Sequence, residues 1–317
     1  MHRSLKKILK ITLPILLGVF LIGYSLSKLS FSDLLSYFKS ANYGWIALGL
    51  FFGLLSHLSR AYRWLFQLEP LGFKVKLPNS IMAVFVTYLI NYTIPRAGEV
   101  ARASILTNYE GVPFEKAIGT IVAERIADLI MIFSIISITL FLQFDFIYGF
   151  LSDTFNPNLI IVGVVLLVIL FVIFTLYIKK SKSAIAIKIK TFVTGLLEGT
   201  LSIFKMQKKW AFIFHTIFIW VMYLLMFYVT TFSVEELHGI GLGAILVGFI
   251  SASFSVAATN GGIGSYPVAV FAAFSIFSIA KEPSIAFGWI MWTSQTLMLI
   301  VLGGLSLLFL PIYNRNK

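Results

Sequence analysis

The chain has 317 residues, of which 59% are hydrophobic and 12% charged, and its mean hydropathy is +0.93. A soluble domain usually carries about twice that charged fraction, so the composition excludes a soluble globular protein and predicts an integral membrane protein. The net charge of +12 lies beside apolar runs, which argues against nucleic acid as a partner, and the absence of cysteine excludes disulfides and thiolate metal sites.

Apolar runs close to the roughly 20 residues that span a bilayer recur along the whole chain. Strand-like alternation with regular turn signals is absent, and only helices then satisfy the backbone in lipid. The predicted fold class is an all-α integral membrane protein, in which residues 1–317 form a single polytopic membrane domain of about six spanning helices. The basic start, MHRSLKKILK, is interpreted as part of a retained first helix rather than as a cleaved signal peptide. The expected spans lie at about 10–27, 43–59, 117–142, 159–178, 210–232 and 284–310.

Lysine and arginine are concentrated in a few segments between the apolar runs. Of the 25 basic residues, 21 fall in five segments, whereas the loops 143–158 and 233–240 contain none. Because basic residues concentrate in cytoplasmic loops, we expect the rich segments and both termini on the cytoplasmic side of the cytoplasmic (inner) membrane. The five rich segments are residues 1–10, 60–78, 96–116, 179–209 and 311–317.

Two broken apolar segments, at about 77–110 and 241–281, are predicted to form re-entrant helical hairpins. If residues 79–95 crossed the membrane fully, the eight basic residues of 179–209 would fall outside. A helix over residues 79–94 would also measure only about 24 Å, short of the ~30 Å hydrocarbon core. The first hairpin is therefore expected to enter from the cytoplasmic side and the second from outside. The two halves, about 1–145 and 155–317, would then form an inverted repeat.

Residues 183–205 mix apolar side chains with ionised ones. This pattern predicts an amphipathic helix in the cytoplasmic interface, drawn to anionic lipid by its lysines. A loop helix packed on the bundle is an equally good interpretation.

The tip of the first hairpin carries charge in apolar surroundings. Thr93 or the chain amides near Pro95 are expected to cap the helix that begins there, and a helix N-terminus within the membrane attracts anions. Arg96 and Arg102 add positive charge suited to bidentate contact with phosphate, and Glu99 lies between them. Because charges within a bilayer are costly, we expect a substrate-binding role, the alternative being a self-neutralised cluster that closes a helix end.

The tip of the second hairpin, TNGGIGSYP, is rich in glycine and uncharged polar residues. Glycines permit tight turns in which successive amides form a nest for anions. A Gly-rich turn also occurs where helices pack closely, so this signal is less specific. The expected substrate-binding residues here are Asn260, Gly261, Gly262, Gly264 and Ser265.

A third charged cluster lies in the expected span 117–142. Glu124 and Asp128 are four residues apart and Arg125 is three from Asp128, so ion pairs within one helix are geometrically possible. Such residues must face protein or water rather than lipid. We expect them to pair with Arg96 or Arg102 across the bundle, and purely structural pairing and proton coupling remain equal alternatives.

Other polar residues are expected to matter less. Arg60 and Arg63, with Tyr62 and Trp64, are interpreted as an interfacial anchor at the end of a span, with contact to a lipid headgroup as an alternative. His57 is interpreted as structural. The sequence contains no phosphate-binding P-loop, HExxH motif, nucleophile elbow or cofactor fingerprint, so we expect no catalytic residues, no metal and no cofactor.

The stretch IPRAGEVARASILTNYEGVPFEKAIGTIVAERIADL resembles the membrane region of the lysylphosphatidylglycerol synthase family, a flippase-like domain that also occurs in stand-alone membrane proteins. The resemblance covers nearly the whole chain. It rests on a P-x-R-x-G-E-x-x-R-like element, a G-[IV]-P element, an E-R-x-x-D element and a later Gly-rich element. The matching residues are Pro95, Arg96, Gly98, Glu99, Arg102, Gly111, Pro113, Glu124, Arg125, Asp128, Gly261, Gly262 and Gly264.

This resemblance implies movement of lipids, such as aminoacylated phosphatidylglycerol, between leaflets. The aminoacyltransferase domain of the family's synthases is missing, so synthesis of the modified lipid is not expected from this chain. Relatives often carry a glutamate just after the Gly-rich element, where this chain has Ser265, Tyr266 and Pro267. This departure leaves the identity of the lipid open. Lipids of glycosyl or polyprenyl-phosphate pathways are further candidates.

We therefore expect a lipid translocase rather than an enzyme. Its expected partners are membrane lipids, namely an anionic or aminoacylated phospholipid or a polyprenyl-phosphate-linked lipid, with a separate lipid synthase and a second copy of the chain as further candidates. The alternatives are an intramembrane enzyme that modifies a lipid or transfers a sugar, and an accessory subunit of a separate synthase. In the enzyme alternative, Glu99, Glu124 and Asp128 would supply an acid or base.

Overall fold

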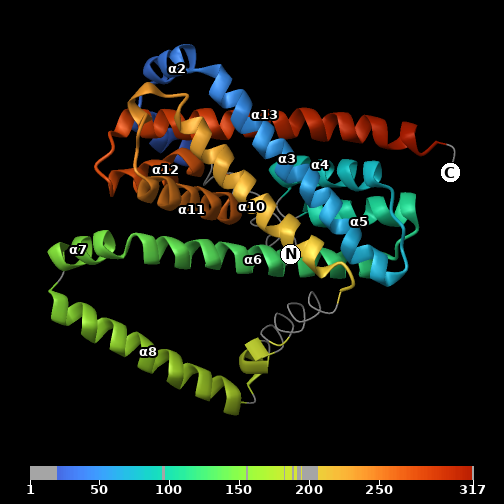
Figure 1. Cartoon of the computed structure of the whole chain (residues 1–317), viewed down its shortest axis with the longest axis horizontal. Helices are drawn as coiled ribbons and strands as arrows, with labels where there is room; N and C mark the ends of the chain where they lie inside the picture. Colours follow the sequence, from blue (N-terminus) through green and yellow to red (C-terminus); the bar gives the residue numbers. More distant parts are fainter. Residues whose placement is uncertain are drawn as a thin grey trace, which may run out of the picture. The chain divides into compact units, whose positions relative to one another are not determined.

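All regular structure in the described part of the chain is helical (Figure 1). The computed structural model divides into two compact units, Met1–Glu124 with Trp210–Lys317, and Arg125–Lys209. The all-α fold class is therefore confirmed for the residues that the structure describes, which are 20–94, 97–154, 156–181, 183–187, 189–190, 194 and 206–315.

The first unit contains most of the helices and both hairpins. Helix α6 (Phe114–Leu142) begins in this unit and continues into the second. The other helices of the first unit are α2 (Phe31–Ser40), α3 (Tyr43–Leu68), η1 (Glu69–Leu71), α4 (Leu77–Thr93), α5 (Ala97–Glu110), α10 (Lys209–Thr231), η2 (Glu235–Leu237), α11 (Leu242–Ala258), α12 (Ser265–Ser275) and α13 (Lys281–Tyr313). The second unit contains the remainder of α6, α7 (Phe144–Thr154) and α8 (Pro157–Lys180).

Three helices in the described part of the chain, α6, α10 and α13, are long and apolar enough to cross a membrane. The pair α2 and α3, bent by 85° at its break, makes a fourth candidate if it is counted as one span. Helices α3, α6, α8, α10 and α13 lie at five of the six expected spans. The sixth expected span, 10–27, falls largely outside the described residues; the part that is described, from residue 20 on, is helical to residue 28. Most of the predicted interfacial helix 183–205 also lies outside the described residues.

Helices α4 and α5 form the first hairpin. Helix α4 ends at Thr93, and the Asn91 side-chain oxygen accepts a hydrogen bond at 2.8 Å from the backbone N–H of Gly98, in the first turn of α5. The Thr93 hydroxyl donates to the Ile90 carbonyl, so the capping contact seen in the first turn of α5 comes from Asn91. A Cβ at position 98 would overlap the Thr87 carbonyl oxygen, so only glycine permits this close approach of the two helices.

Helices α11 and α12 form the second hairpin. The turn between them contains Gly261, Gly262 and Gly264, with φ angles of +64°, +83° and +68°. Glycine adopts this left-handed conformation without the steric cost that other residues incur. The predicted helix breaks at the two glycine- or proline-containing tips are therefore present at both hairpins.

The two hairpin tips meet beside α13. A Cβ on Gly261 would overlap the ring of Tyr92, near the end of α4. The Thr296 hydroxyl on α13 donates to Tyr92 Oη at 3.2 Å, and Trp292 Nε1 donates to the Gly261 carbonyl at 2.8 Å. Thr296 lies near the middle of this 33-residue helix, so the two tips come together halfway along α13.

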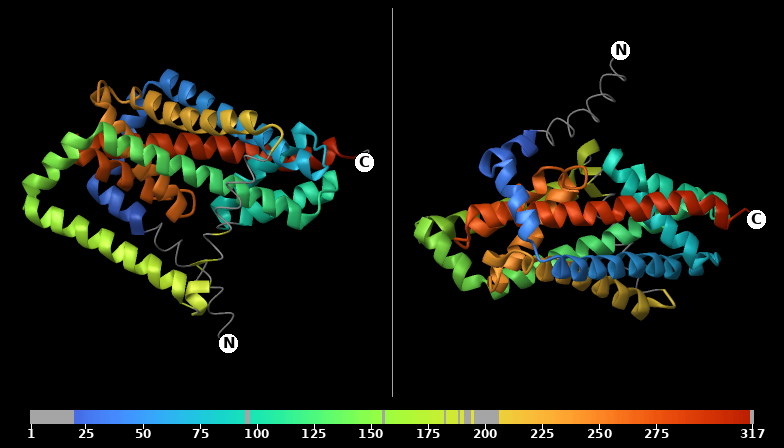
Figure 2. Two further views of the ribbon diagram at one scale, coloured as in Figure 1. Left: turned by 60° about the horizontal axis from the view of Figure 1, so that its bottom comes forward. Right: turned by 90° about the horizontal axis from the view of Figure 1, so that it is seen from above.

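Helix α13 carries one hairpin on each half of its length (Figure 2). In its C-terminal half, an added Cβ on Gly303 would lie 2.7 Å from Leu89 Cβ of α4. In its N-terminal half, an added Cβ on Gly288 would lie 2.5 Å from Pro267 Cα of α12. Two glycines thus bring both hairpins close to one helix.

Gly288→Ala is expected to lower the free energy of unfolding by about 1–3 kcal/mol, because the methyl group overpacks a close contact with backbone atoms. Gly304→Ala is the matched control, since nothing lies within 4 Å of a Cβ at that position on the same helix. Thermal unfolding of both purified variants checks the prediction. Equal melting temperatures for the two would contradict it.

The ends of α4, α5 and α13 are joined by buried amides. Asn79 and Asn314 exchange two hydrogen bonds, at 2.8 and 2.9 Å, and Asn79 Nδ2 also donates to Glu110 Oε1 at 2.5 Å. This contact fixes the open end of the first hairpin on the C-terminal end of α13.

Candidate functional site

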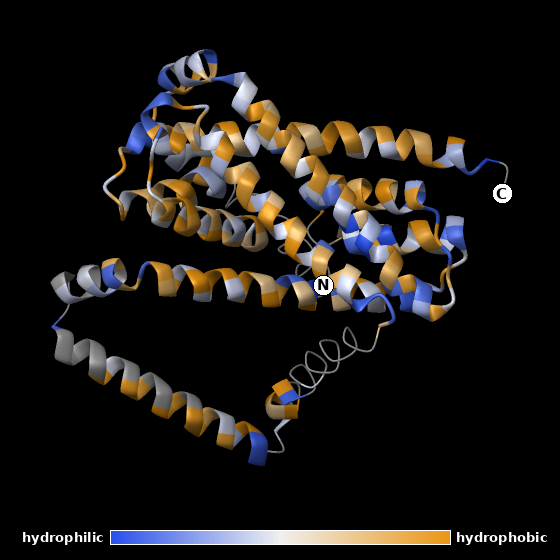
Figure 3. Ribbon diagram, viewed as in Figure 1, coloured by the Kyte–Doolittle hydropathy of each residue, from blue (hydrophilic) through white to orange (hydrophobic). Residues whose placement is uncertain are grey.

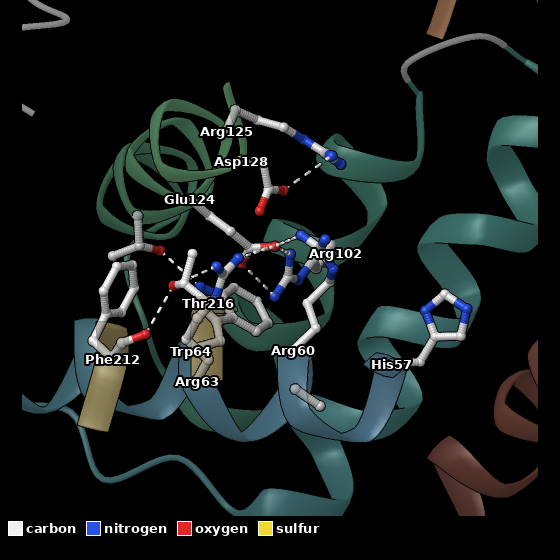
Figure 4. A network of polar contacts seen from close by, with 12 residues as sticks. His57, Arg60, Arg63, Trp64, Arg102, Glu124, Arg125, Asp128, Phe212 and Thr216 are labelled. Atoms are coloured by element: carbon white, nitrogen blue, oxygen red, sulfur yellow. Dashed lines mark hydrogen bonds and ion pairs between the residues drawn. The ribbon is translucent and has the colours of Figure 1, made fainter. Parts of the chain in front are cut away.

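Three arginines surround one glutamate where α3, α5 and α6 meet (Figure 4). The Glu124 carboxylate lies 2.5 Å from Arg60 Nη1 and 3.5 Å from Arg63 Nη2. Arg102 makes two contacts with it, from Nη1 to Oε1 at 3.2 Å and from Nη2 to Oε2 at 3.1 Å. We call these four side chains the arginine cluster.

The arginine cluster is buried. No side chain in it is more than 5% exposed. Its formal charges are three positive and one negative, and two of the three helices that carry them, α3 and α6, are otherwise largely hydrophobic (Figure 3). Removing such charges from water costs several kcal/mol per ion, so the fold uses a substantial share of its stability to hold them here.

Aromatic and hydroxyl side chains hold the guanidinium groups in place. The Arg102 guanidinium carbon lies 3.8 Å from the centroid of the Trp64 ring, within the range of a cation–π contact. Trp64 is fixed in turn by a hydrogen bond of 2.8 Å from its Nε1 to the Thr120 hydroxyl. Arg63 Nη1 donates to the Thr216 hydroxyl of α10 at 2.8 Å. Four helices therefore contribute to the orientation of the cluster.

This arrangement is suited to binding an oxyanion. Guanidinium groups bind carboxylate and phosphate oxygens alike, and both terminal nitrogens of Arg102 already lie at the Glu124 carboxylate, one in a hydrogen bond and the other in an ion-pair contact. In the described part of the chain, no group of three or more histidine, cysteine, aspartate or glutamate side chains is placed to hold a metal ion. The side chains of the cluster themselves offer charge recognition by arginine.

The structure contains the predicted ion pair between Glu124 and Arg102. Arg96 lies outside the described residues. Glu99 is half-buried on α5, and Thr93 is exposed.

Arg125 and Asp128 belong to the second unit and pair with each other, with 3.8 Å between Arg125 Nη1 and Asp128 Oδ2. The Arg125 side chain is 46% exposed. These two residues therefore form an ion pair between neighbouring turns of α6.

The glycine turn of the second hairpin is held by hydroxyl groups. The Ser265 hydroxyl lies 2.6 Å from that of Ser255 and 2.9 Å from that of Thr259. The Thr259 hydroxyl accepts a bond of 3.1 Å from the Gly262 N–H, and Asn260 is buried. The expected residues of this tip, including Gly261 and Gly264, thus lie together in one turn that packs on α4 and α13.

The arginine cluster lies below the tip of the first hairpin rather than at it. Trp64 shares a buried cluster with Ala83 and Val86 of α4. From Val86 to Tyr92, where the tips meet, α4 rises roughly 9 Å at 1.5 Å per residue. Arg102 was expected at the tip of the first hairpin, but it lies on the second turn of α5. The arginine cluster and the glycine turn of the second hairpin therefore form two separate polar levels.

Arg60 and Arg63 are the members of the arginine cluster that the sequence interpretation did not place there. Their interpretation as an interfacial anchor is wrong, because both are buried and contact Glu124. Helix α3 continues to Leu68, so these arginines lie within the helix rather than beyond its end. Arg60 and Arg63 are three residues apart and Trp64 is four from Arg60, a spacing that places all three on one face of a helix. This spacing was the signal in the sequence of a shared buried face.

Comparison with known proteins agrees with this membrane architecture. A family model described as "Lysylphosphatidylglycerol synthase TM region" matches residues 11–304. A UPF0104 membrane protein of Methanocaldococcus jannaschii is 24% identical to this chain over 147 residues, which are 45% of this chain and 44% of that protein. The match thus spans less than half the length of that relative. No solved structure matches the chain.

Proposed function

The chain belongs to the lysylphosphatidylglycerol synthase TM region family, a family of multi-pass membrane proteins, and from this membership we propose that it is a lipid translocase. Its substrate is an anionic or aminoacylated phospholipid, or a related lipid phosphate, which it moves between leaflets. The chain carries out no covalent chemistry in this proposal. A separate synthase would supply an aminoacylated substrate.

The observation that carries the proposal is the burial of Arg60, Arg63 and Arg102 around a single carboxylate. Buried charge within a membrane protein is expensive and marks substrate pathways more often than structural contacts. Phosphate is the group common to the candidate lipids, and arginine binds it through paired hydrogen bonds. The acyl chains remain in the surrounding lipid.

Glu124 acts as an internal anion in this mechanism. Its carboxylate occupies the position between the guanidinium groups that a headgroup phosphate would take. The incoming phosphate replaces the carboxylate as partner of the arginines, and the returning carboxylate helps to release it. This exchange keeps the buried guanidinium groups paired with an anion throughout transport, which avoids the cost of exposing them to lipid unpaired.

We propose a topology of about six spanning helices and two re-entrant hairpins in an inverted repeat, with both termini cytoplasmic. Two measurements support it. Helix α4 has 17 residues and α12 has 11, lengths of roughly 26 and 16 Å against a hydrocarbon core of ~30 Å. Their tips also meet beside the middle of α13, as expected for two half-length hairpins from opposite sides.

Translocation by purified protein tests the proposal. Proteoliposomes of phosphatidylcholine with a trace of fluorescent phosphatidylglycerol are treated with a membrane-impermeant quencher, and the rate at which inner-leaflet label becomes quenchable is measured. We expect wild-type protein to accelerate this rate and Arg60→Gln to reduce it at least roughly tenfold, since one charged contact of about 1.5–3 kcal/mol is lost.

Arg125→Gln is the matched control, because Arg125 is a half-exposed arginine that pairs with Asp128. It should translocate at nearly the wild-type rate. Wild-type protein that leaves the label as protected as empty vesicles do would refute the proposed function.

A further inference from the structure

One face of α3 is polar well beyond the two arginines. At about 100° per residue, positions 57, 60, 63, 64 and 67 fall within roughly 120° of the helix circumference. All five are buried in a helix whose remaining surface is largely apolar. The side chains are, in chain order, His57, Arg60, Arg63, Trp64 and Gln67.

The two ends of this polar face carry orphan polar atoms. His57 Nε2 and Gln67 Oε1 are buried without a hydrogen-bond partner among the described residues. The residues are 1% and 7% exposed. Buried polar atoms of this kind are rare in folded proteins, and each requires an explanation. Here both lie on the same helix face as the arginine cluster, one on each side of it.

The other nitrogen of His57 has a structural contact. His57 Nδ1 lies 3.4 Å from Tyr223 Oη of α10, and Tyr223 Oη lies 3.3 Å from Tyr88 Oη of α4. The His57 ring also packs against the Tyr88 ring, with centroids 4.5 Å apart. These contacts fix the imidazole and leave Nε2 available for a ligand. Figure 4 shows His57 and Arg60 extending to the same side of α3.

From these placements we propose that this face of α3 is the track along which the lipid headgroup crosses, with Gln67 and His57 as neutral contacts on the two sides of the arginine cluster. The inference rests on the proposed translocase function and names the path at that site. From residue 57 to residue 67 the track measures roughly 15 Å, about half of the hydrocarbon core. The headgroup passes from one uncharged contact, over the guanidinium groups, to the other.

A lipid headgroup can pass along the track only if the contacts at the two ends of the track bind it more weakly than the arginines do. A chain of arginines alone would hold a phosphate too tightly to release it, whereas conduction needs several sites of moderate affinity. His57 and Gln67 offer hydrogen bonds without net charge, so the headgroup gains contact as it leaves the arginines without becoming trapped. The hydroxyls of Tyr88 and Tyr223 add uncharged partners at the His57 end.

Three variants test the track. In His57→Asn the amide group extends only as far as Nδ1 of the imidazole, so the polar atom at the position of Nε2 is lost. In His57→Gln the longer side chain places a polar atom near the position of Nε2. Gln67→Met removes the side-chain amide at nearly constant volume. Each is compared with wild type for the translocation rate of fluorescent phosphatidylglycerol in phosphatidylcholine vesicles. Thermal stabilisation by phosphatidylglycerol in detergent is measured in parallel as the readout of binding at the arginine cluster.

We expect His57→Asn and Gln67→Met to slow translocation by roughly tenfold, with lipid-induced stabilisation unchanged. His57→Asn loses the hydrogen bond from Nε2 to the headgroup phosphate, and Gln67→Met loses the bond that Gln67 Oε1 accepts from a hydroxyl of the headgroup glycerol. His57→Gln should stay within roughly threefold of wild type by the same reasoning. A merely structural role for His57 would reverse the order, since asparagine preserves the Tyr223 contact, and that order would overturn the track. Translocation at the wild-type rate in all three variants would also overturn it while leaving the translocase function intact. An inactive wild-type protein would refute the proposed function itself, and the track with it.

Discussion

Glu124→Gln is expected to lower the free energy of unfolding by about 3–5 kcal/mol in a neutral detergent, the usual cost of removing one partner of a buried ion pair. The substitution keeps the shape of the side chain but leaves the guanidinium groups of Arg60, Arg63 and Arg102 with one anion fewer. Thermal unfolding of purified wild type and variant measures the loss.

Anionic lipid should restore much of this stability. If a headgroup phosphate takes the place of the Glu124 carboxylate, phosphatidylglycerol will raise the melting temperature of Glu124→Gln more than that of wild type. In the variant, no carboxylate competes with the phosphate for the three arginines. Phosphatidylcholine should raise both equally. Glu115→Gln, at an exposed position on the same helix, is the control and should melt close to wild type in every condition. A variant as stable as Glu115→Gln in neutral detergent would contradict the assignment of Glu124 as the central counter-charge.

Arg102→Lys is expected to reduce the translocation rate by roughly tenfold to a hundredfold although it preserves the positive charge. Arg102 contacts Glu124 through two nitrogens, and its guanidinium carbon lies over the Trp64 ring at 3.8 Å from the centroid. A lysine ammonium is a point charge that cannot reproduce this two-point contact and the stacking together. The vesicle assay with fluorescent phosphatidylglycerol measures the rate.

Arg125→Lys provides the comparison for this prediction. The Arg125 side chain is half-exposed and its contact with Asp128 is 3.8 Å, a pair that lysine can replace. We expect nearly wild-type translocation from it. Equal rates for Arg102→Lys and Arg125→Lys would show that charge alone matters at position 102 and that the contact through two nitrogens does not.

The positions of most long helices follow from the apolar runs, because a bilayer demands long stretches of apolar residues. Helices α3, α6, α8, α10 and α13 lie where such runs occur. The end of α3 is the instructive exception, since the helix continues to Leu68 although the apolar run stops before Arg60. An apolar run in the sequence ends wherever polar residues begin. The end of the run does not show whether those polar residues face water or the protein interior.

The pairing of Glu124 with Arg102 was predictable, because a carboxylate within an apolar span needs a positive partner. The contribution of Arg60 and Arg63 was not, since basic residues beside Tyr62 and Trp64 are also typical of a membrane interface. The role of Asn91 in capping α5 was equally hidden. Capping residues usually stand just before the helix they cap, whereas Asn91 belongs to the helix on the other side of the break.

The attachment of both hairpins to one helix limits how the molecule can move. Close packing at Gly303 joins α4 to α13, and close packing at Gly288 joins α12 to the same helix. A tilt of α13 about its midpoint, where Tyr92 and Gly261 touch, would carry its two ends in opposite directions and displace the hairpins in opposite senses. In the proposed translocase, opening toward one leaflet would thereby be linked to closing toward the other, so that no continuous path for ions would cross the bilayer.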